Sequence, residues 1–265
     1  MQKERIVITG STRGLGLCMA REFLARGCRA VVSGRTWSAV DPVARLLAAK
    51  HPDGFVRGIP CDVGNPSQVQ ALWDAAAQAM GGVDHWISNA GIGQPLVPIW
   101  DLPAAEMEDV VRTDLLGTLY GARTAMRGMM AQGSGAIWFM EGHGSDGRIM
   151  KGLSVYGTAK RAVRYAAHAL AEEARGSGVM VGTLSPGIMI TGFTMGQIER
   201  GTPLERERAK KLFNILADKP ETVARFLVPR ILAARKSGTH IAWLSGRKIM
   251  LRFATSGLAR RKVID

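Results

Sequence analysis

The sequence is poor in cysteine and has no long apolar run. Its three cysteines, Cys18, Cys28 and Cys61, form no C-x-x-C pair. An odd number without paired spacing argues against a disulfide framework and is typical of a reducing compartment. No apolar run approaches the roughly 18 residues that a membrane-spanning helix needs. The chain starts almost directly with a strand-like segment at 6–8, which leaves no room for a signal peptide. We therefore expect a soluble, cytoplasmic protein, and we expect no metal site.

Acidic residues are scarce relative to basic ones. Lys and Arg number 35 against 22 Asp and Glu, a formal net charge of +13. Such a surplus favours anionic partners, among them nucleotides, nucleic acid and acidic membrane surfaces. Aromatic residues make up 6% of the chain, and no nucleic-acid recognition motif is present, so nucleic acid is not an expected partner.

Short apolar runs alternate along the chain with helix-length segments. The predicted strands are 6–9, 30–33, 55–61, 85–88, 136–140, 179–184 and 240–244, and the predicted helices are 15–26, 39–50, 66–80, 104–132, 154–175 and 221–235. This alternation indicates parallel strands joined by right-handed crossover helices on both faces. We predict one α/β domain over 1–265, a doubly wound parallel sheet of Rossmann type. A charged excursion at about 188–218 and a basic tail at 245–265 lie outside the alternation.

The loop between the first strand and the first helix is rich in glycine. Its residues are Thr9, Gly10, Ser11, Thr12, Arg13, Gly14, Leu15 and Gly16. Gly10 permits a tight turn, Gly14 lets the backbone approach a pyrophosphate, and Gly16 lets helix and strand pack closely. The N–H groups of the helix N-terminus then face the anion. In this strand–turn–helix context the pattern predicts dinucleotide binding, with a purely structural turn as the alternative.

The second predicted strand is followed by no acidic residue. An NAD enzyme usually places one there for the ribose 2′-hydroxyl. Here Arg35 and Arg13 are available for a 2′-phosphate, with added hydroxyls from Ser11 and Thr36. This set favours NADP(H), whereas Arg35 as a solvated surface charge is the alternative. After the third strand, Asp62 and Val63 are candidates for the adenine end, although Asp62 equally fits a turn cap.

Tyr156 and Lys160 lie four residues apart in a predicted helix, so the phenol and the ammonium share one face. A tyrosine with an ordinary pKa of about 10 is a poor acid at neutral pH. A nearby cation lowers that pKa, which suits proton donation to a carbonyl oxygen while hydride reaches its carbon. The spacing alone is common, but after a phosphate loop in an α/β pattern it predicts a catalytic pair.

These motifs together resemble the short-chain dehydrogenase/reductase family along the whole chain. The motifs that carry the resemblance are the Thr9–Gly16 loop, Asp62, Asn89-Ala90-Gly91, Tyr156-x-x-x-Lys160 and Ser185-Pro186-Gly187-x-x-x-Thr191. The resemblance implies that Asn89, Ala90 and Gly91 support the sheet beside the cofactor. It implies that Lys160 also bonds the nicotinamide ribose. The residues implied to hold the nicotinamide carboxamide are Pro186, Gly187, Ile188 and Thr191.

Within this family the chain resembles the chlorophyll b reductases, which reduce a formyl group of a tetrapyrrole to hydroxymethyl. The similar stretches are 140–148, 184–187, 213–217, 220–224, 227–231 and 259–262. The implied function is NADPH-dependent carbonyl reduction. Two alternatives stay open: reduction or oxidation of another bulky hydrophobic ketone, aldehyde or alcohol, and a non-catalytic NADP(H) sensor.

The chain departs from the family pattern at two sites. His143 stands where the family places a serine that bonds the substrate oxygen, and Ser145, two residues later, is our candidate for that role. The alternatives are that Ser145 only bonds its own turn and that His143 polarises the carbonyl. Asp114 stands where the family has an asparagine that holds a water near the lysine. We expect Asp114 to hold that water and to stabilise Lys160 as a cation, with a shifted pH profile.

The segments outside the alternation suggest partners. Small and apolar residues at 190–198 are candidates to line an apolar pocket for a hydrophobic carbonyl substrate. Ordinary packing within the protein is the alternative. The stretch 236–265 holds seven Lys or Arg and one acidic residue, and either contacts an anionic membrane or packs on a neighbouring subunit. The family resemblance implies a homodimer or homotetramer in which the helices at 104–132 and 154–175 pair across a two-fold axis.

Overall fold

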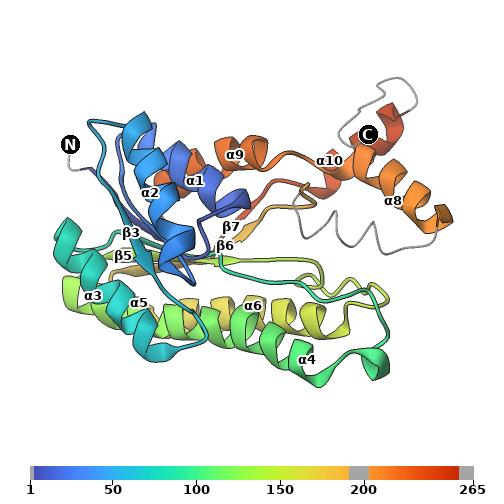
Figure 1. The fold of residues 1–265 in the computed structure, drawn as a ribbon, viewed down its shortest axis with the longest axis horizontal. Helices are drawn as coiled ribbons and strands as arrows, with labels where there is room; N and C mark the ends of the chain where they lie inside the picture. Colours follow the sequence, from blue (N-terminus) through green and yellow to red (C-terminus); the bar gives the residue numbers. More distant parts are fainter. Residues whose placement is uncertain (1–2, 191–202, 257–265) are drawn as a thin grey trace.

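A computed structural model describes residues 3–190 and 203–256, and it contains the predicted parallel sheet (Figure 1). The strands are β1 (Arg5–Ile8), β2 (Arg29–Gly34), β3 (Val56–Pro60), β4 (His85–Ser88), β5 (Gly135–Met140), β6 (Val179–Ser185) and β7 (Thr239–Ala242). They pair in the order β3-β2-β1-β4-β5-β6-β7, and every pair is parallel. The predicted fold class is confirmed.

Helices cover both faces of the sheet. The helices are α1 (Gly14–Leu24), α2 (Trp37–Lys50), α3 (Pro66–Met80), α4 (Ala104–Val110), α5 (Gly117–Gln132), α6 (Ser154–Glu173), α8 (Pro203–Leu216), α9 (Pro220–Ala233) and α10 (Gly246–Thr255). In Figure 1, α1, α2 and α9 lie on one face, and α3, α5 and α6 lie on the other. A short 3-10 turn, η1 (Ile99–Asp101), precedes α4.

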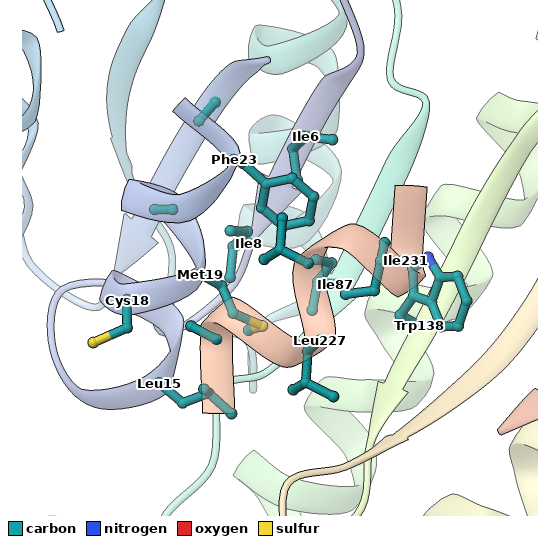
Figure 2. Close-up of a cluster of buried hydrophobic side chains, with 14 of the residues drawn as sticks. Ile6, Ile8, Leu15, Cys18, Met19, Phe23, Ile87, Trp138, Leu227 and Ile231 are labelled. Carbon is teal, nitrogen blue, oxygen red and sulfur yellow. The ribbon is translucent and has the colours of Figure 1, made fainter. Parts of the chain in front are cut away.

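The hydrophobic core forms two layers because successive strand residues point to opposite faces. Ile6 and Ile8 of β1 pack toward α1 and α9, while Val7 between them packs toward α3 and α5. Figure 2 shows the first layer, in which Phe23 of α1 and Leu227 of α9 lie against the strands. All three β1 side chains are fully buried, as expected for a parallel sheet covered on both sides. This core holds the carboxyl ends of the strands in fixed positions.

The structure differs from the sequence prediction in the long central helix. Residues 104–132 are not one α-helix, because a π-helix, η2 (Val111–Leu116), separates α4 from α5. A π-turn inserts one extra residue into the helical ladder and often occurs at functional sites. Asp114 lies within it and is fully buried.

The two segments outside the alternation each contain a helix. Within the 188–218 excursion, α8 is helical, and Met189 forms a β-bridge with Asp218. The tail begins with α10, which follows β7 and packs on α8. Thr191 and the rest of the predicted pocket segment up to 198 lie outside the described residues.

Candidate active site

The glycine-rich loop forms a cradle at the carboxyl end of β1. Gly10 has a φ of +62°, and a Cβ there would lie 2.6 Å from the Cα of Ala90. A Cβ on Gly16 would lie 2.6 Å from the carbonyl oxygen of Gly10. Gly14 has a φ of +56° and open space where its side chain would be. The backbone is therefore accessible at the N-terminus of α1, and the loop fits a pyrophosphate there.

Asn89 fastens this loop to the neighbouring strand β4. Its side-chain Nδ2 donates to the carbonyl oxygens of Thr9 at 2.9 Å and Gly10 at 3.0 Å. The backbone N–H groups of Asn89 and Ala90 both donate to the Thr9 hydroxyl. The arrangement agrees with the implied supporting role of the Asn89-Ala90-Gly91 motif.

The hydroxyls of Ser11 and Thr36 form hydrogen bonds with the protein backbone. The Ser11 Oγ is fully buried, donates to the carbonyl of Ile8 at 2.7 Å and accepts from the N–H of Ser33 at 2.9 Å. Thr36 caps α2 by accepting from the N–H of Ala39. The expectation that Ser11 offers its hydroxyl to a phosphate is therefore wrong for this geometry, because both of its bonds tie the loop to β1 and β2.

Arg13 and Arg35 are exposed at the ends of neighbouring strands. Thr12 and Gly34, the residues just before them, are in close contact: a Cβ on Gly34 would lie 2.7 Å from the Thr12 Cγ2. The two loops thus lie side by side, each with an exposed arginine, and the contact of Arg13 and Arg35 with a 2′-phosphate stays a prediction.

Asp62 does act as a turn cap. Its Oδ1 accepts from the N–H of Gly64 at 3.0 Å, and its Oδ2 lies 3.5 Å from Arg112. Val63 is buried against Gly117 at the start of α5. Asp62 keeps part of its carboxylate exposed, and the adenine contact stays a prediction.

Tyr156, Lys160 and Asp114 come together beside this cradle. Tyr156 and Lys160 lie on α6, with the ammonium 5.6 Å from the centre of the phenol ring. The Lys160 Nζ is 3.1 Å from Asp114 Oδ2, and both side chains are buried. The other Asp114 oxygen accepts from the N–H of Ile92 at 2.7 Å. Asp114 thus joins the loop after β4 to the lysine.

Burial and charge oppose each other at this cluster. Burial raises the pKa of Tyr156 above its ordinary value, although the Lys160 charge works to lower it and Asp114 adds to the rise. The Lys160 charge lowers the pKa of Tyr156 as expected, but burial outweighs that effect in the protein alone. Burial would lower the pKa of Lys160, but the Asp114 carboxylate and the Tyr156 phenol raise it overall. The cluster holds a charged lysine next to a protonated tyrosine, which is a proton donor in the form needed for reduction.

The Gly142–Ser145 turn closes over the phenol. A side chain on Gly142 would collide with the Tyr156 hydroxyl, so only glycine fits there. Ser145 Oγ accepts from the N–H of Gly142 at 3.0 Å and donates to the carbonyl of Lys160 at 3.1 Å. Its single proton is therefore used inside the protein. The Nε2 of His143 is buried and has no hydrogen-bond partner within the described residues.

Gln94 is a positioning residue that the sequence did not indicate. It is buried, its Oε1 accepts from the N–H of Tyr156 at 2.7 Å, and its Nε2 donates to the carbonyl of Gly152 at 2.8 Å. It thereby links the loop after β4 to the first turn of α6. A glutamine in a Gly- and Pro-containing loop carries no motif, so only the three-dimensional contact reveals it.

The segment after β6 frames the other side of the site. Pro186 is buried, Gly187 has a φ of +73°, and Ile188 accepts from the N–H of Asp218. These residues extend from the carboxyl end of β6, as a nicotinamide-holding loop would. Thr191, the last residue of this predicted set, falls in the part that the structure leaves undescribed.

Two other features are absent from the described residues. No helix there is long and apolar enough to cross a membrane. No group of three or more His, Cys, Asp or Glu side chains there is placed to hold a metal ion.

Known proteins are similar to this chain in sequence. The profile of the short chain dehydrogenase family matches residues 4–200. The probable chlorophyll(ide) b reductase NYC1 of Arabidopsis thaliana is 34% identical over 276 residues, covering 98% of this chain and 54% of the relative. The chlorophyll(ide) b reductase NOL of the same plant is 33% identical over 267 residues, covering 97% of this chain and 75% of NOL. Both names include the word chloroplastic. The chain thus spans about half the length of NYC1.

A solved structure has the same fold. An alcohol dehydrogenase from the archaeon Thermococcus sibiricus, complexed with 5-hydroxy-NADP, superposes with a TM-score of 0.75. The two share 21% sequence identity, and the match covers 90% of this chain and 96% of that one. At this identity the likeness concerns the fold alone.

Proposed function

Because this chain belongs to the short-chain dehydrogenase family, we propose that it is an NADPH-dependent carbonyl reductase of the chlorophyll b reductase kind. Its substrate class is a bulky hydrophobic aldehyde, with the formyl group of a tetrapyrrole as the leading candidate. The observation that carries the proposal is the buried Tyr156–Lys160–Asp114 cluster beside a glycine cradle fit for a dinucleotide.

The proton comes from Tyr156. When bound, NADPH supplies the hydride to the carbonyl carbon. Tyr156 donates its phenolic proton to the carbonyl oxygen, and the Lys160 ammonium stabilises the phenolate that remains. Asp114 keeps Lys160 charged despite its burial. Lys160 is also the residue that would bond the nicotinamide ribose.

The cofactor is held by the loops after β1 and β2. The backbone from Gly10 to Gly16 fits the pyrophosphate, and Arg13 with Arg35 supports a choice of NADPH over NADH. Asn89 keeps the loop in place through its bonds to Thr9 and Gly10. Pro186, Gly187, Ile188 and Thr191 remain the proposed nicotinamide-holding set.

A second hydrogen bond to the carbonyl oxygen is needed to orient it. Ser145 was the expected donor, but its proton goes to the carbonyl of Lys160. His143, in the same turn, has a buried Nε2 without a hydrogen-bond partner in the described part of the chain, and buried polar groups without partners call for an explanation. We assign the orienting role to His143 and a turn-fixing role to Ser145.

The substrate class follows from the relatives and from the loops near Tyr156. Two of the similar proteins are named chlorophyll(ide) b reductases. Leu96, Trp100, Ile149 and Met150 are exposed on the loops before α4 and α6. Apolar side chains there favour a ligand with a large apolar surface.

The experiment that tests the function is NADPH consumption with a panel of carbonyl compounds. The panel contains formyl tetrapyrroles, the matching methyl tetrapyrroles as controls, and simpler bulky ketones and aldehydes. We expect turnover of the formyl tetrapyrrole and none of its methyl counterpart. Turnover only of simpler ketones would favour the alternative substrate class.

Tyr156→Phe is the matched variant for this assay. It removes one oxygen atom and leaves the cradle intact, so we expect NADPH binding near the parent level and loss of turnover by a factor of about 100 or more. NADPH binding by the parent protein without turnover of any compound would indicate a nucleotide sensor instead.

The assembly and the compartment are further parts of the proposal. We propose a homodimer or homotetramer built on α4, α5 and α6. A reducing, cytoplasmic compartment is supported by the three cysteines, which are buried and unpaired.

A further inference from the structure

Helix α10 is amphipathic, but its basic side faces the protein and its apolar side faces the solvent. Its basic residues Lys248 and Arg252 face the protein. The Lys248 ammonium lies 2.7 Å from the centre of the Trp243 ring. Arg252 donates to the carbonyl of Leu216 and pairs with Asp218 at 2.7 Å. The inner face of the helix is therefore fixed by charged contacts.

The outer face of α10 is apolar. Met250 is 72% exposed, Leu251 is 64% exposed and Phe253 is 46% exposed. A surface helix ordinarily turns such residues inward and its charges outward. Leu212 of α8, which packs on α10, is also exposed. An apolar surface of this kind marks an interaction site.

A second group of exposed apolar residues lies at the same end of the molecule. Trp100 is 82% exposed and Ile149 is 95% exposed, on loops that touch each other where Gly152 meets Leu96. Figure 1 shows α8 and α10 at the right-hand end, above the loops that lead into α4 and α6. We call these two groups together the apolar end. Its members are Leu96, Ile99, Trp100, Ile149, Met150, Leu212, Met250, Leu251 and Phe253.

We propose that the apolar end docks on the surface of an anionic lipid bilayer. The charge of the chain fits this partner: Arg247 is exposed beside the apolar face of α10, and the sequence continues with Arg260, Arg261 and Lys262. Apolar side chains inserted at the headgroup level with basic residues beside them are the signature of interfacial binding. The stretch 236–264 contains no acidic residue that would repel such a surface.

The position of the apolar end favours a bilayer over a second copy of the chain. The loops of this end lead directly to Tyr156, since Gln94 joins them to the first turn of α6. A protein partner seated across both groups would cover the approach to the phenol. A bilayer at the same place leaves that approach open to molecules dissolved in the lipid.

The test is vesicle cosedimentation of the full chain, which needs no turnover and so stands apart from the proposed function. The probes are vesicles of phosphatidylcholine with phosphatidylglycerol and vesicles of phosphatidylcholine alone. We expect binding to the anionic vesicles, weaker binding to the neutral ones, and loss of binding as salt is raised. No binding of the parent protein to anionic vesicles at low salt would overturn the proposal.

Leu251→Asp and Leu46→Asp form a matched pair of variants. Both leucines are exposed on helices, but Leu46 lies on α2, away from the apolar end. We expect Leu251→Asp to reduce vesicle binding about tenfold or more, as the loss of one inserted apolar side chain implies, and Leu46→Asp to bind like the parent. Arg247→Glu, which leaves the apolar residues in place, should also weaken binding.

Light scattering of the same variants separates a bilayer from a second copy. An unchanged oligomeric state in Leu251→Asp, together with lost vesicle binding, supports the lipid surface. A smaller assembly in Leu251→Asp, or undiminished vesicle binding, would show that the apolar end serves another purpose. NADPH affinity of each variant verifies that the fold is retained.

Discussion

Asp114 and Lys160 form a buried ion pair, with 3.1 Å between the carboxylate and the ammonium. The pair joins two helices, because Asp114 lies in the π-turn between α4 and α5, and Lys160 lies in α6. The second Asp114 oxygen is held by the N–H of Ile92. The carboxylate is thus fixed at both oxygens and acts on the tyrosine through the lysine and directly through space.

Asp114→Asn should move the pH profile of reduction downward. An asparagine oxygen can still accept from Ile92, but the negative charge that raises the pKa of Tyr156 is gone. Tyr156 must be protonated to donate, so the alkaline limb, where activity falls, should shift to lower pH. The measurement is kcat against pH with saturating NADPH and one substrate.

Asp109→Asn is the control for that profile. Asp109 lies on α4, two residues before η2 begins, and its side chain is exposed, so its charge is screened by solvent. We expect its profile to match that of the parent. An unchanged profile in Asp114→Asn would mean that Asp114 only fills the space and holds a water.

Ser145→Ala should mainly lower stability, whereas His143→Ala should mainly lower kcat. Ser145→Ala removes the bonds to Gly142 and Lys160, and we expect a less stable protein by about 1–3 kcal/mol in unfolding free energy. His143→Ala should cost less stability than Ser145→Ala and lower kcat, because the Nε2 that it removes has no hydrogen-bond partner in the described residues. Thermal unfolding and steady-state kinetics measure the two effects.

His143→Gln extends this comparison because glutamine keeps a hydrogen-bond donor. Partial recovery of kcat relative to His143→Ala would support donation to the substrate oxygen. Normal kcat in His143→Ala would return the orienting role to Ser145.

Arg35→Ala should reduce the preference for NADPH over NADH. The guanidinium is exposed beside the cradle and has no acidic neighbour in the loop after β2. A charge-assisted bond to the 2′-phosphate is worth roughly 1.5–3 kcal/mol, or about a tenfold to hundredfold change in affinity. Fluorescence titration with both cofactors gives the ratio.

Arg45→Ala is the matched control for the cofactor titration. Arg45 is an exposed arginine farther along α2, paired with Asp41. Its removal should leave both affinities unchanged. Equal affinity of the parent protein for NADH and NADPH would contradict the proposed role of Arg35 in binding the 2′-phosphate.

Tyr165→Asp should reduce the size of the assembly. Tyr165 is 77% exposed on α6, and Met130 is exposed on the neighbouring α5, on the face proposed for subunit contact. A buried carboxylate without a partner is costly at an interface. Light scattering at micromolar concentration should show smaller particles than for the parent. A monomeric parent would contradict the proposed oligomer.

The sequence predicted elements well where local chemistry marks their ends. The helix expected at 66–80 is α3 with the same bounds, because the Asn65 side chain caps its start and Gly81 ends it with a φ of +77°. The π-turn around Asp114 was not expected, since a helical pattern of apolar residues looks the same on either side of one inserted residue. Only packing against Val63 and the loop after β4 reveals it.

The sequence indicated which residues form the site better than it indicated their hydrogen bonds. The four-residue spacing of Tyr156 and Lys160 was enough to place them together. The direction of the Ser145 hydroxyl depends on a turn whose geometry no spacing encodes. The same holds for α10: its amphipathic pattern was visible, but Trp243 and Asp218, which attract its basic face inward, lie outside the helix.

The contact between Arg252 and Asp218 makes α10 and the residues after β6 one cooperative unit. Asp218 bonds Arg252 and the Trp243 indole through its carboxylate, while its backbone exchanges hydrogen bonds with Ile188 and Ile190. Local unfolding of α10 would therefore expose the amides of Ile190 and Asp218 to solvent hydrogen exchange at the same time. The last helix of the described chain thus controls how often the β-bridge between Met189 and Asp218 opens.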